Sequence, residues 1–359
     1  MNGTDTAETG QGGAGRRETG AGTRRARVRR AIRAASRPGP WQRGPLLASL
    51  ALLLGLLMLL HAKIPNRGLG NLGSLVESFL PWFGLFVPLL LAGALWRRSA
   101  AAVVALLLPV VVWLNLFGGL LGDKSHPGGD LTLAEQNVNA DNPDPAGTAR
   151  DLAASGAQAL ALVELTPHAT PLYEKGLAKA YPYHTVQGTV GLWSKLPLSD
   201  TRPIDIMDYG PLAATKPADK KLAANRALRT TVATDHGPLT VYVAHLGSVR
   251  VNPRAGFWTA SRNIGVRALG KAVAADPSER VVLLGDLNGT TDDRALAGLT
   301  ARMHSAQDAA GDGFGFSWPA GFPVVRTDQI LVRGVRPEKA WVLPATRSDH
   351  LPVAAAISW

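Results

Sequence analysis

The sequence predicts an α/β domain of two packed β-sheets flanked by helices, preceded by a stem of three transmembrane helices. Two observations support this fold class. Residues 45–122 contain three long apolar runs, and from Leu131 onward short apolar segments alternate with windows of helical periodicity. We therefore divide the chain into a basic tail (1–44), a membrane stem (45–122) and one layered α/β domain (125–359).

Composition excludes several classes of site and of partner. The chain has no cysteine, so disulfides, thiolate metal sites and a cysteine nucleophile are excluded. The formal net charge is +11, yet residues 1–44 carry ten Arg against three acidic residues, while residues 125–359 carry 23 basic and 22 acidic residues. We expect the tail to be disordered and cytoplasmic, and either to set membrane topology or to lie on anionic headgroups. The near-neutral α/β domain disfavours nucleic acid as a partner.

The stem prediction rests on the apolar runs at residues 46–62, 79–95 and 99–121. A backbone in lipid must satisfy its own hydrogen bonds, so each run is read as a helix. A cleaved signal peptide is the alternative for the first run, but its basic leader is unusually long and two more runs follow. Pro81 and Pro88 predict a kink in the second run.

The distribution of arginines predicts how the stem is oriented. Ten precede the first run and Arg97 and Arg98 separate the second from the third, whereas only Lys63 and Arg67 lie between the first and second. Positive loops stay in the cytoplasm, so the N-terminus is expected inside and the α/β domain outside the cell membrane.

The α/β domain is predicted from short strands and three helices. Strands are expected at residues 131–139, 159–165, 189–195, 227–234, 239–246, 280–288, 326–332 and 351–358. Helices are expected at residues 146–155, 171–180 and 256–275, and Gly/Pro turns separate the elements. The sequence has no internal repeat.

Polar residues follow the carboxyl ends of several of these strands, where turns can present them to one crevice. They are Asn137, Glu164, His245, Asp286, Asn288, Asp328, Asp349 and His350. There is no P-loop, GxGxxG after a strand, HExxH or GxSxG. The remaining set of carboxylates, amides and imidazoles suits Mg²⁺, with Mn²⁺ as the alternative, and suits phosphoryl chemistry.

Each of these residues also has a simpler explanation. Asn137 can form a turn, Asp286 and Asn288 can cap one, and His245 can be a hydrogen-bonded core histidine. Glu164 is harder to explain, because an unpaired carboxylate after a buried strand is costly and a bound cation would remove that cost. The set as a whole, in this order, is therefore more informative than any member.

Seven segments of the chain, taken together and in this order, resemble the endonuclease/exonuclease/phosphatase superfamily. They are QNVN (136–139), ALVEL (161–165), TVGLWSKLPL (189–198), VYVAHL (241–246), LLGDLN (283–288), SWPAGFPVVRTDQILV (317–332) and RSDHLPV (347–353). This DNase I-like family includes nucleases, inositol-polyphosphate phosphatases and sphingomyelinases, and the resemblance implies a four-layer sandwich over residues 130–359. With its stem, the chain also resembles the membrane-anchored VanJ-type proteins associated with teicoplanin and vancomycin resistance.

The resemblance implies a role for each residue. Glu164, Asn137 and Asp349 would bind Mg²⁺, Asp286 would orient or deprotonate water, and Asn288 would hold that water and a phosphate oxygen. His350, fixed by Asp328, would stabilise the phosphorane, and His245 would contact the phosphate or protonate the leaving oxygen. Two positions depart from the family pattern: Gln329 stands where Tyr or His is usual, and Val163 where Gln is common.

The sequence is compatible with three functions. The first is an extracytoplasmic metal-dependent hydrolase of a phosphorylated or pyrophosphorylated lipid, such as a polyprenyl carrier of cell-wall synthesis, whose head would be bound by Arg229, Arg262 and Arg267. A tether to the bilayer would raise the effective concentration of such a lipid. The second is a membrane-tethered nuclease, and the third is a non-catalytic module that binds a wall precursor or an antibiotic.

Overall fold

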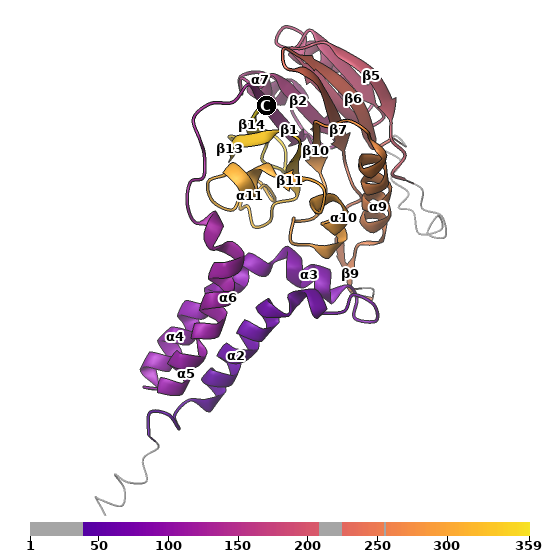
Figure 1. Ribbon diagram of the computed structural model, residues 1–359. Helices are drawn as coiled ribbons and strands as arrows, with labels where there is room; N and C mark the ends of the chain where they lie inside the picture. The colour runs from indigo at the N-terminus through magenta and orange to yellow at the C-terminus, as the bar shows by residue number, and fades with distance from the viewer. Residues whose placement is uncertain (1–38, 208–224, 255) are drawn as a thin grey trace, which may run out of the picture.

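The computed structural model describes residues 39–207, 225–254 and 256–359. A helical stem carries a larger β-sheet domain, with α3 and β9 at the junction between them (Figure 1). The predicted disordered tail lies outside the described residues, except for residues 39–44.

Apolar helices build the stem. They are α2 (Pro45–Leu59), η1 (His61–Lys63), α3 (Leu72–Ser78), η2 (Leu80–Leu85), α4 (Phe86–Trp96), α5 (Ala100–Ala105), α6 (Leu107–Phe117) and η3 (Gly118–Leu120). The buried side chains of Ala51 and Ala94 allow the helices to pack closely. Ser99 caps α5 by accepting a hydrogen bond from the Ala102 amide at 3.1 Å.

The prediction of three full membrane spans needs correction. Among the described residues, Ala100–Leu120 is the one helix that is long and apolar enough to cross a membrane by itself. The first run forms only α2, whose 15 residues cover about 22 Å, less than a hydrocarbon core of roughly 30 Å. The second run follows α3 at a bend of 69°, and the pair passes the same test only when counted together. Pro81 lies just after this bend and lacks the N–H that a continuous helix would use.

The first β-sheet has the strand order β13-β14-β1-β2-β4-β3. Its strands are β1 (Leu131–Asn137), β2 (Ala159–Val163), β3 (Tyr183–Gln187), β4 (Val190–Ser194), β13 (Arg336–Val342) and β14 (Val353–Ser358). Only β1 and β2 pair in parallel among the described strands of this sheet, so their carboxyl ends lie at the same edge.

The second sheet has the order β11-β12-β10-β7-β6-β5. Its strands are β5 (Leu198–Pro203), β6 (Ala227–Thr234), β7 (Gly237–Ala244), β10 (Val281–Asp286), β11 (His304–Ser305) and β12 (Asp328–Arg333). Here β7 and β10 are parallel, and β12 is antiparallel to β10 with Asp286 opposite Asp328. The carboxyl ends of β7 and β10 and the start of β12 therefore share one edge.

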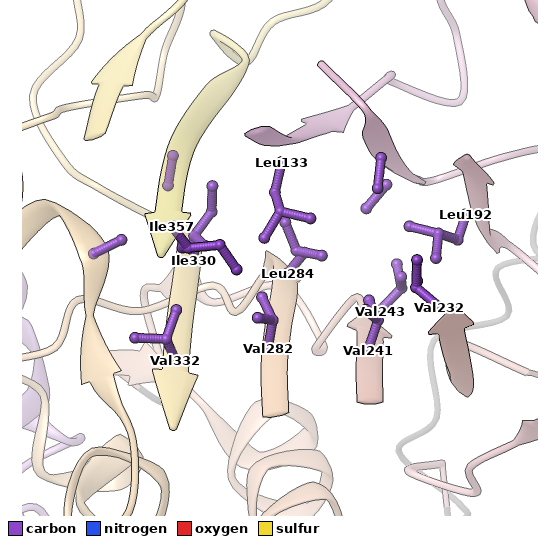
Figure 2. Close-up of a cluster of buried hydrophobic side chains, with 14 of the residues drawn as sticks. Leu133, Leu192, Val232, Val241, Val243, Val282, Leu284, Ile330, Val332 and Ile357 are labelled. Atoms are coloured by element: carbon purple, nitrogen blue, oxygen red, sulfur yellow. The ribbon is translucent and has the colours of Figure 1, made fainter. Parts of the chain in front are cut away.

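The main core lies between the two sheets (Figure 2). Alternate residues such as Leu133 on β1 and Leu284 on β10 point into it and are fully buried. Two further apolar clusters attach helices to the outer faces of the sheets. The helices of this domain are α7 (Pro145–Ala153), α8 (Thr170–Leu177), α9 (Ala260–Ala275), η5 (Arg294–Leu296), α10 (Ala297–Thr300) and α11 (Ala306–Ala310). The predicted pair of packed sheets flanked by helices is confirmed.

One helix boundary was predicted wrongly. The helix expected at residues 256–275 begins at Ala260, because β9 (Gly256–Trp258) pairs instead with β8 (Arg250–Asn252). This hairpin contacts the stem, where the Asn71 side chain donates a hydrogen bond to the Phe257 carbonyl at 2.7 Å.

Polar contacts fasten α3 and η2 to two loops of the α/β domain. Glu77, with a side chain only 1% exposed, pairs with Arg294 at 2.8 Å. The Ser74 hydroxyl donates to Asp293 at 3.1 Å. The Trp82 indole donates to the Val324 carbonyl at 2.7 Å. These contacts join parts of the chain more than 200 residues apart, so the stem and the α/β domain form one packed unit.

Candidate active site

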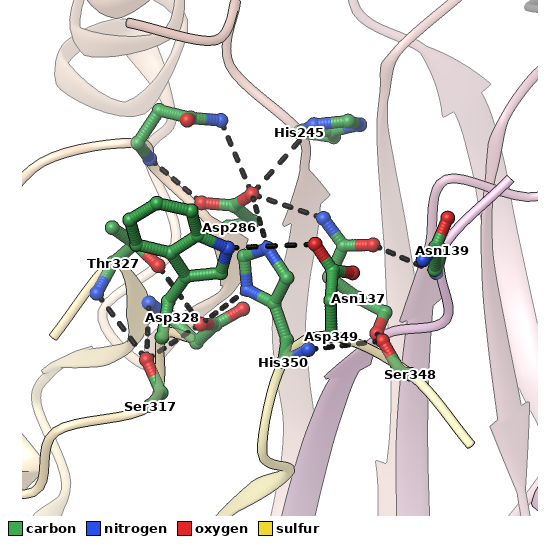
Figure 3. Close-up of polar contacts among 12 residues, drawn as sticks. Asn137, Asn139, His245, Asp286, Ser317, Thr327, Asp328, Ser348, Asp349 and His350 are labelled. Atoms are coloured by element: carbon green, nitrogen blue, oxygen red, sulfur yellow. Dashed lines mark hydrogen bonds and ion pairs between the residues drawn. The ribbon is translucent and has the colours of Figure 1, made fainter. Parts of the chain in front are cut away.

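Asp286, the last residue of β10, is the centre of a polar cluster at the shared strand edges (Figure 3). Its carboxylate accepts hydrogen bonds from the Asn137 side chain at 3.0 Å and from the Asn288 backbone at 2.8 Å. The Asn288 side chain adds a third at 3.1 Å and also donates to the Leu246 carbonyl. Asn288 has φ of 48°, a left-handed conformation that Asn tolerates, and this turns its side chain back to Asp286.

His350 lies against Asp286 and is held from behind by Asp328. Its Nδ1 is 2.8 Å from Asp328 Oδ2, and its Nε2 is 3.9 Å from Asp286 Oδ2. Ser317 and Thr327 donate to the same Asp328 oxygen at 2.6 and 3.0 Å. Burial alone would lower the pKa of His350, but the charge and hydrogen bond of Asp328 outweigh it and raise that pKa to about 10. The ring is therefore an imidazolium near neutral pH.

His245, which follows β7, has the opposite charge state. Its Nε2 is 3.7 Å from Asp286 Oδ2, and one Arg226 guanidinium nitrogen lies 2.7 Å from each of its two ring nitrogens. Burial, followed by the positive charges of Arg226 and His350, lowers the pKa of His245 well below its usual range. His245 is neutral at pH 7, which favours phosphate contact over the alternative role of proton donor.

The Asp286 carboxyl can exchange a proton near neutral pH. Burial raises its pKa most, the nearby Asp328 charge raises it further, and His350 and the bonds from Asn288 and Asn137 oppose the shift. The resulting pKa of about 7 is the range that suits a general base.

Glu164 lies at the first position after β2 and offers the strongest indication of a cation site. Its φ of 67° is unusual for a residue other than Gly or Asn, and such strain is concentrated at functional sites. Burial raises the pKa of Glu164, although Arg226, His350 and a hydrogen bond with Asn137 oppose this. Together with Asp349, this set supplies the hard oxygen ligands that Mg²⁺ or Mn²⁺ prefers, so the residues present fit the predicted metal.

A second group of buried side chains also lies close enough together to bind a metal. Asp286, Asp328 and His350 each offer an atom within 4.8 Å of the others. The Nδ1 of His350 is already bonded to Asp328, which leaves Nε2 as the ring atom that faces Asp286. Two neighbouring groups of side chains therefore offer ligands for a cation, one containing Glu164 and one containing Asp286.

These side chains line a pocket of about 440 Å³. Seven of the predicted residues contribute to its wall: Asn137, Glu164, His245, Asp286, Asn288, Asp349 and His350. Asp328 is buried behind His350. Ser78 and Phe79 of the stem also line the pocket, as do Val251 and Phe257 of the β8–β9 hairpin. The structure thus brings all eight predicted catalytic and metal-binding residues together.

The three predicted substrate-binding arginines are not brought to the pocket. Arg229 pairs with Asp276 at 3.0 Å and donates to Thr231 and Thr240 on the strands of the second sheet. Arg262 is fully buried and pairs with Asp293 at 2.6 Å. Arg267 is exposed on α9 and is not among the pocket residues. Partners distant in sequence engage the guanidinium groups of Arg229 and Arg262, and none of the three predicted arginines is among the residues of the pocket wall.

Arg262 has a different part in the site. Its Nη1 donates to the Asn288 carbonyl at 3.1 Å, and Asp293 in turn accepts from Ser74 of the stem. A continuous set of buried contacts therefore runs from α3 to the residue that holds Asp286.

Several residues of the site were not predicted from the sequence. Ser317 orients Asp328, and Trp318 lies at the pocket with its indole 3.4 Å from Asp349. Ser78 and Phe79 belong to a segment read only as stem. Gln329, a departure from the family pattern, bonds to the Gly289 and Arg326 carbonyls and so stabilises neighbouring loops.

Comparison with known proteins identifies one family. The profile of the Endonuclease/Exonuclease/phosphatase family matches residues 134–350, which span every residue of the cluster described above. No curated protein sequence matches the chain.

Several solved structures are similar to part of this chain at low sequence identity. A humanised D. rerio TDP2 with 14 mutations is 19% identical, with a TM-score of 0.50 over 64% of this chain and 99% of that one. A conserved protein of unknown function from Enterococcus faecalis V583 is 15% identical, with a TM-score of 0.49 over 64% and 99%. The Bacteroides thetaiotaomicron mannosyl-6-phosphatase Bt3783 is 13% identical, with a TM-score of 0.47 over 64% and 100%. At these identities the likeness concerns the fold alone.

Proposed function

Because the chain belongs to the endonuclease/exonuclease/phosphatase family, we propose that it is a divalent-metal-dependent phosphoesterase that hydrolyses a phosphorylated or pyrophosphorylated lipid. The observation that carries the proposal is the composition of the pocket wall. Asp286, Asn288 and His350 share one pocket with Ser78 and Phe79 of an apolar stem. Groups suited to phosphoryl transfer therefore lie beside a segment suited to lipid.

The cation would be held by Glu164, Asn137 and Asp349. When bound, it would neutralise negative charge on the non-bridging oxygens of the phosphate. The proposal does not choose between Mg²⁺ and Mn²⁺, because both prefer the oxygen ligands offered here.

The protein's own residues would perform the proton and charge steps. Asp286, with a pKa of about 7, accepts a proton from the attacking water, and Asn288 orients that water through its side-chain amide. The His350 imidazolium donates a hydrogen bond to the oxygen on which negative charge develops. Asp328 keeps His350 charged and correctly oriented.

A lipid substrate is supported by the stem surface. Large apolar side chains are strongly exposed along it, among them Leu53 at 61%, Leu89 at 67% and Val111 at 62%. Large apolar side chains exposed in such number are typical of a surface that contacts lipid or another protein. The near-neutral charge of residues 125–359 does not favour a nucleic-acid substrate.

We further propose an extracytoplasmic α/β domain, a polyprenyl cell-wall carrier as the lipid, and a VanJ-type role in glycopeptide resistance. The arginine distribution supports the orientation, because positive segments remain in the cytoplasm. A tethered domain at the outer surface would meet carrier lipids in the same bilayer.

Purified full-length protein in detergent, assayed with undecaprenyl pyrophosphate and with plasmid DNA, tests the proposal. We expect Mg²⁺-dependent phosphate release and no nicking, and we expect Asp286→Asn to reduce the rate about 10²- to 10⁴-fold. Asp312→Asn, a change at an acidic residue outside the pocket, is the matched control and should retain the rate. Nicking without phosphate release would identify a nuclease, and tight binding without turnover would identify a binding module.

A further inference from the structure

A second cavity, of about 470 Å³, lies between the stem and the α/β domain. Stem residues of η2, α4 and α6 form most of its wall, and Phe314 and Phe316 of the α/β domain complete it. Its volume lies in the range of ordinary ligand pockets. It is distinct from the polar pocket around Asp286, since the two share no lining residue.

The wall of this cavity offers apolar contact and little else. Its two indole N–H groups are already engaged: Trp82 donates to the Val324 carbonyl at 2.7 Å, and Trp113 donates to the Pro81 carbonyl at 2.8 Å. Stacked rings, such as Trp82 and Phe316 at 5.6 Å, hold the wall in shape. A ligand here would be selected by hydrocarbon surface, because a polar ligand would lose its hydrogen bonds to water.

Two chain segments form a wall of both cavities. Trp82 lines the apolar cavity, and Phe79, three residues earlier, lines the catalytic pocket. Phe316 lines the apolar cavity, and Trp318, two residues later, lines the catalytic pocket. Two residues of extended chain reach at most about 7 Å, so the cavities are neighbours.

The other side of the cavity reaches the exposed apolar surface of the stem. Leu85 and Leu114 belong to its wall and are also 57% and 49% exposed. A hydrocarbon chain can therefore contact the cavity from the stem surface while its polar end faces the catalytic pocket.

We propose that this cavity binds the hydrocarbon chain next to the phosphate of the substrate. The inference rests on the proposed lipid phosphoesterase activity and deepens it, because it names the part of the protein that selects a lipid over a water-soluble phosphoester. The occupant is the chain of the substrate itself, with its phosphate in the pocket of Asp286 and its first apolar carbons against Trp82 and Phe316.

Two adjacent valines of α6 provide a matched test. Val110 lines the cavity, whereas Val111 is 62% exposed and is not part of its wall. For each Val→Trp variant of the full chain in micelles, kcat/KM is measured with a long-chain polyprenyl diphosphate and with p-nitrophenyl phosphate. We expect Val110→Trp to lower the ratio of the two values about tenfold, equivalent to roughly 1.4 kcal/mol, and Val111→Trp to leave it unchanged. An unchanged ratio in Val110→Trp, or an equal fall in both variants, would overturn the inference.

A binding measurement separates this inference from the proposed activity. Asp286→Asn protein is irradiated with a polyprenyl diphosphate that carries a diazirine on its chain, and the labelled peptides are identified by mass spectrometry. Labels within residues 81–88, 110–114 or 314–316 that decrease in the double variant with Val110→Trp support the cavity, even if the wild type shows no turnover. Labels confined to other stem surfaces exclude it.

Discussion

The two histidines of the candidate active site differ in charge, although both have Nε2 within 4 Å of the same Asp286 oxygen, at 3.7 and 3.9 Å. The difference in charge comes from the charged side chain beside each ring, which is Asp328 for His350 and Arg226 for His245. Asp328 raises the pKa of His350 to about 10, while burial and Arg226 lower that of His245. One imidazolium and one neutral ring therefore face a carboxyl that titrates near pH 7.

The pH dependence of activity tests this arrangement. His350 is charged below its pKa of about 10, so kcat/KM should fall as pH rises through that value. Asp328→Asn removes the charge that raises this pKa and should move the alkaline limb to lower pH by at least about one unit. Ser317→Ala keeps the charge and is the control, with a smaller shift expected. An alkaline limb that stays in place in Asp328→Asn would contradict the assignment.

The same pKa predicts a stability effect with a defined sign. The pKa of folded His350 lies above its ordinary value of 6.5, so the charged ring contributes its full stabilisation below pH 6.5. That contribution is lost as pH rises toward about 10. Thermal melts of wild type and His350→Gln should therefore differ most at pH 6 and converge by about pH 10. A difference that does not change with pH would exclude this linkage.

Arg262 is expected to act as a positioning residue. Its side chain and that of Asp293 are both fully buried, so Arg262→Met leaves a buried carboxylate and should cost about 3 to 5 kcal/mol of unfolding free energy. Arg336→Met is the control: Arg336 pairs with Glu338 but is 74% exposed, so its loss should cost at most about 1 kcal/mol. Chemical denaturation measures both. Arg262→Met should also lower kcat, because the Asn288 carbonyl loses its donor.

At the scale of elements, α3 is the segment that joins the stem to the chemistry. It has only seven residues, too few to be stable as an isolated helix in water. Tertiary contacts therefore hold it in place. Arg294 bonds to Glu77 on α3 and also to the carbonyls of His61 and Ile64. Ser78 at the end of this helix then lies in the pocket wall.

Arg294→Met should loosen this junction. It leaves Glu77 buried with His61 as a neighbour at 3.4 Å, and we expect a loss of about 2 kcal/mol, below the fully buried case because Arg294 is 30% exposed. For a domain of this size the loss corresponds to a fall in Tm of roughly 4 to 8 °C. Differential scanning fluorimetry beside the Arg336→Met control measures it. A Tm equal to that of the control would mean that the pair does not hold the stem.

At the scale of the whole molecule, the stem is bent where it meets the α/β domain. One described helix is long enough to cross alone, and the pair of α3 with Leu80–Trp96 is bent by 69°. Phe79 lies at this bend and belongs to the wall of the pocket around Asp286. A straight span through this region would remove that residue from the wall.

Reporter fusions after residues 44, 97 and 125 test the proposed orientation. We expect cytoplasmic signals at 44 and 97 and an extracytoplasmic signal at 125, because arginines flank the first two positions. Removing Arg97 and Arg98 is a control that should weaken the topology. A cytoplasmic signal at residue 125 would exclude a substrate at the outer surface.

The sequence alone determined the family, the two-sheet architecture and the eight polar residues at the strand edge. Strand periodicity is a local property, and parallel strands such as β1 and β2 bring their following residues to one edge wherever the rest of the chain lies. Asn137 and Glu164 could therefore be recognised before any coordinates were known.

Only the tertiary structure decided which other side chains reach that edge. Arg229 and Arg262 carry the positive charge that suits phosphate, but they form salt bridges with Asp276 and Asp293 respectively. The pocket wall includes Phe79, which lies 207 residues before Asp286 in the sequence. Such pairings depend on which surfaces meet when the stem packs on the domain, and residue spacing along the chain carries no information about that contact.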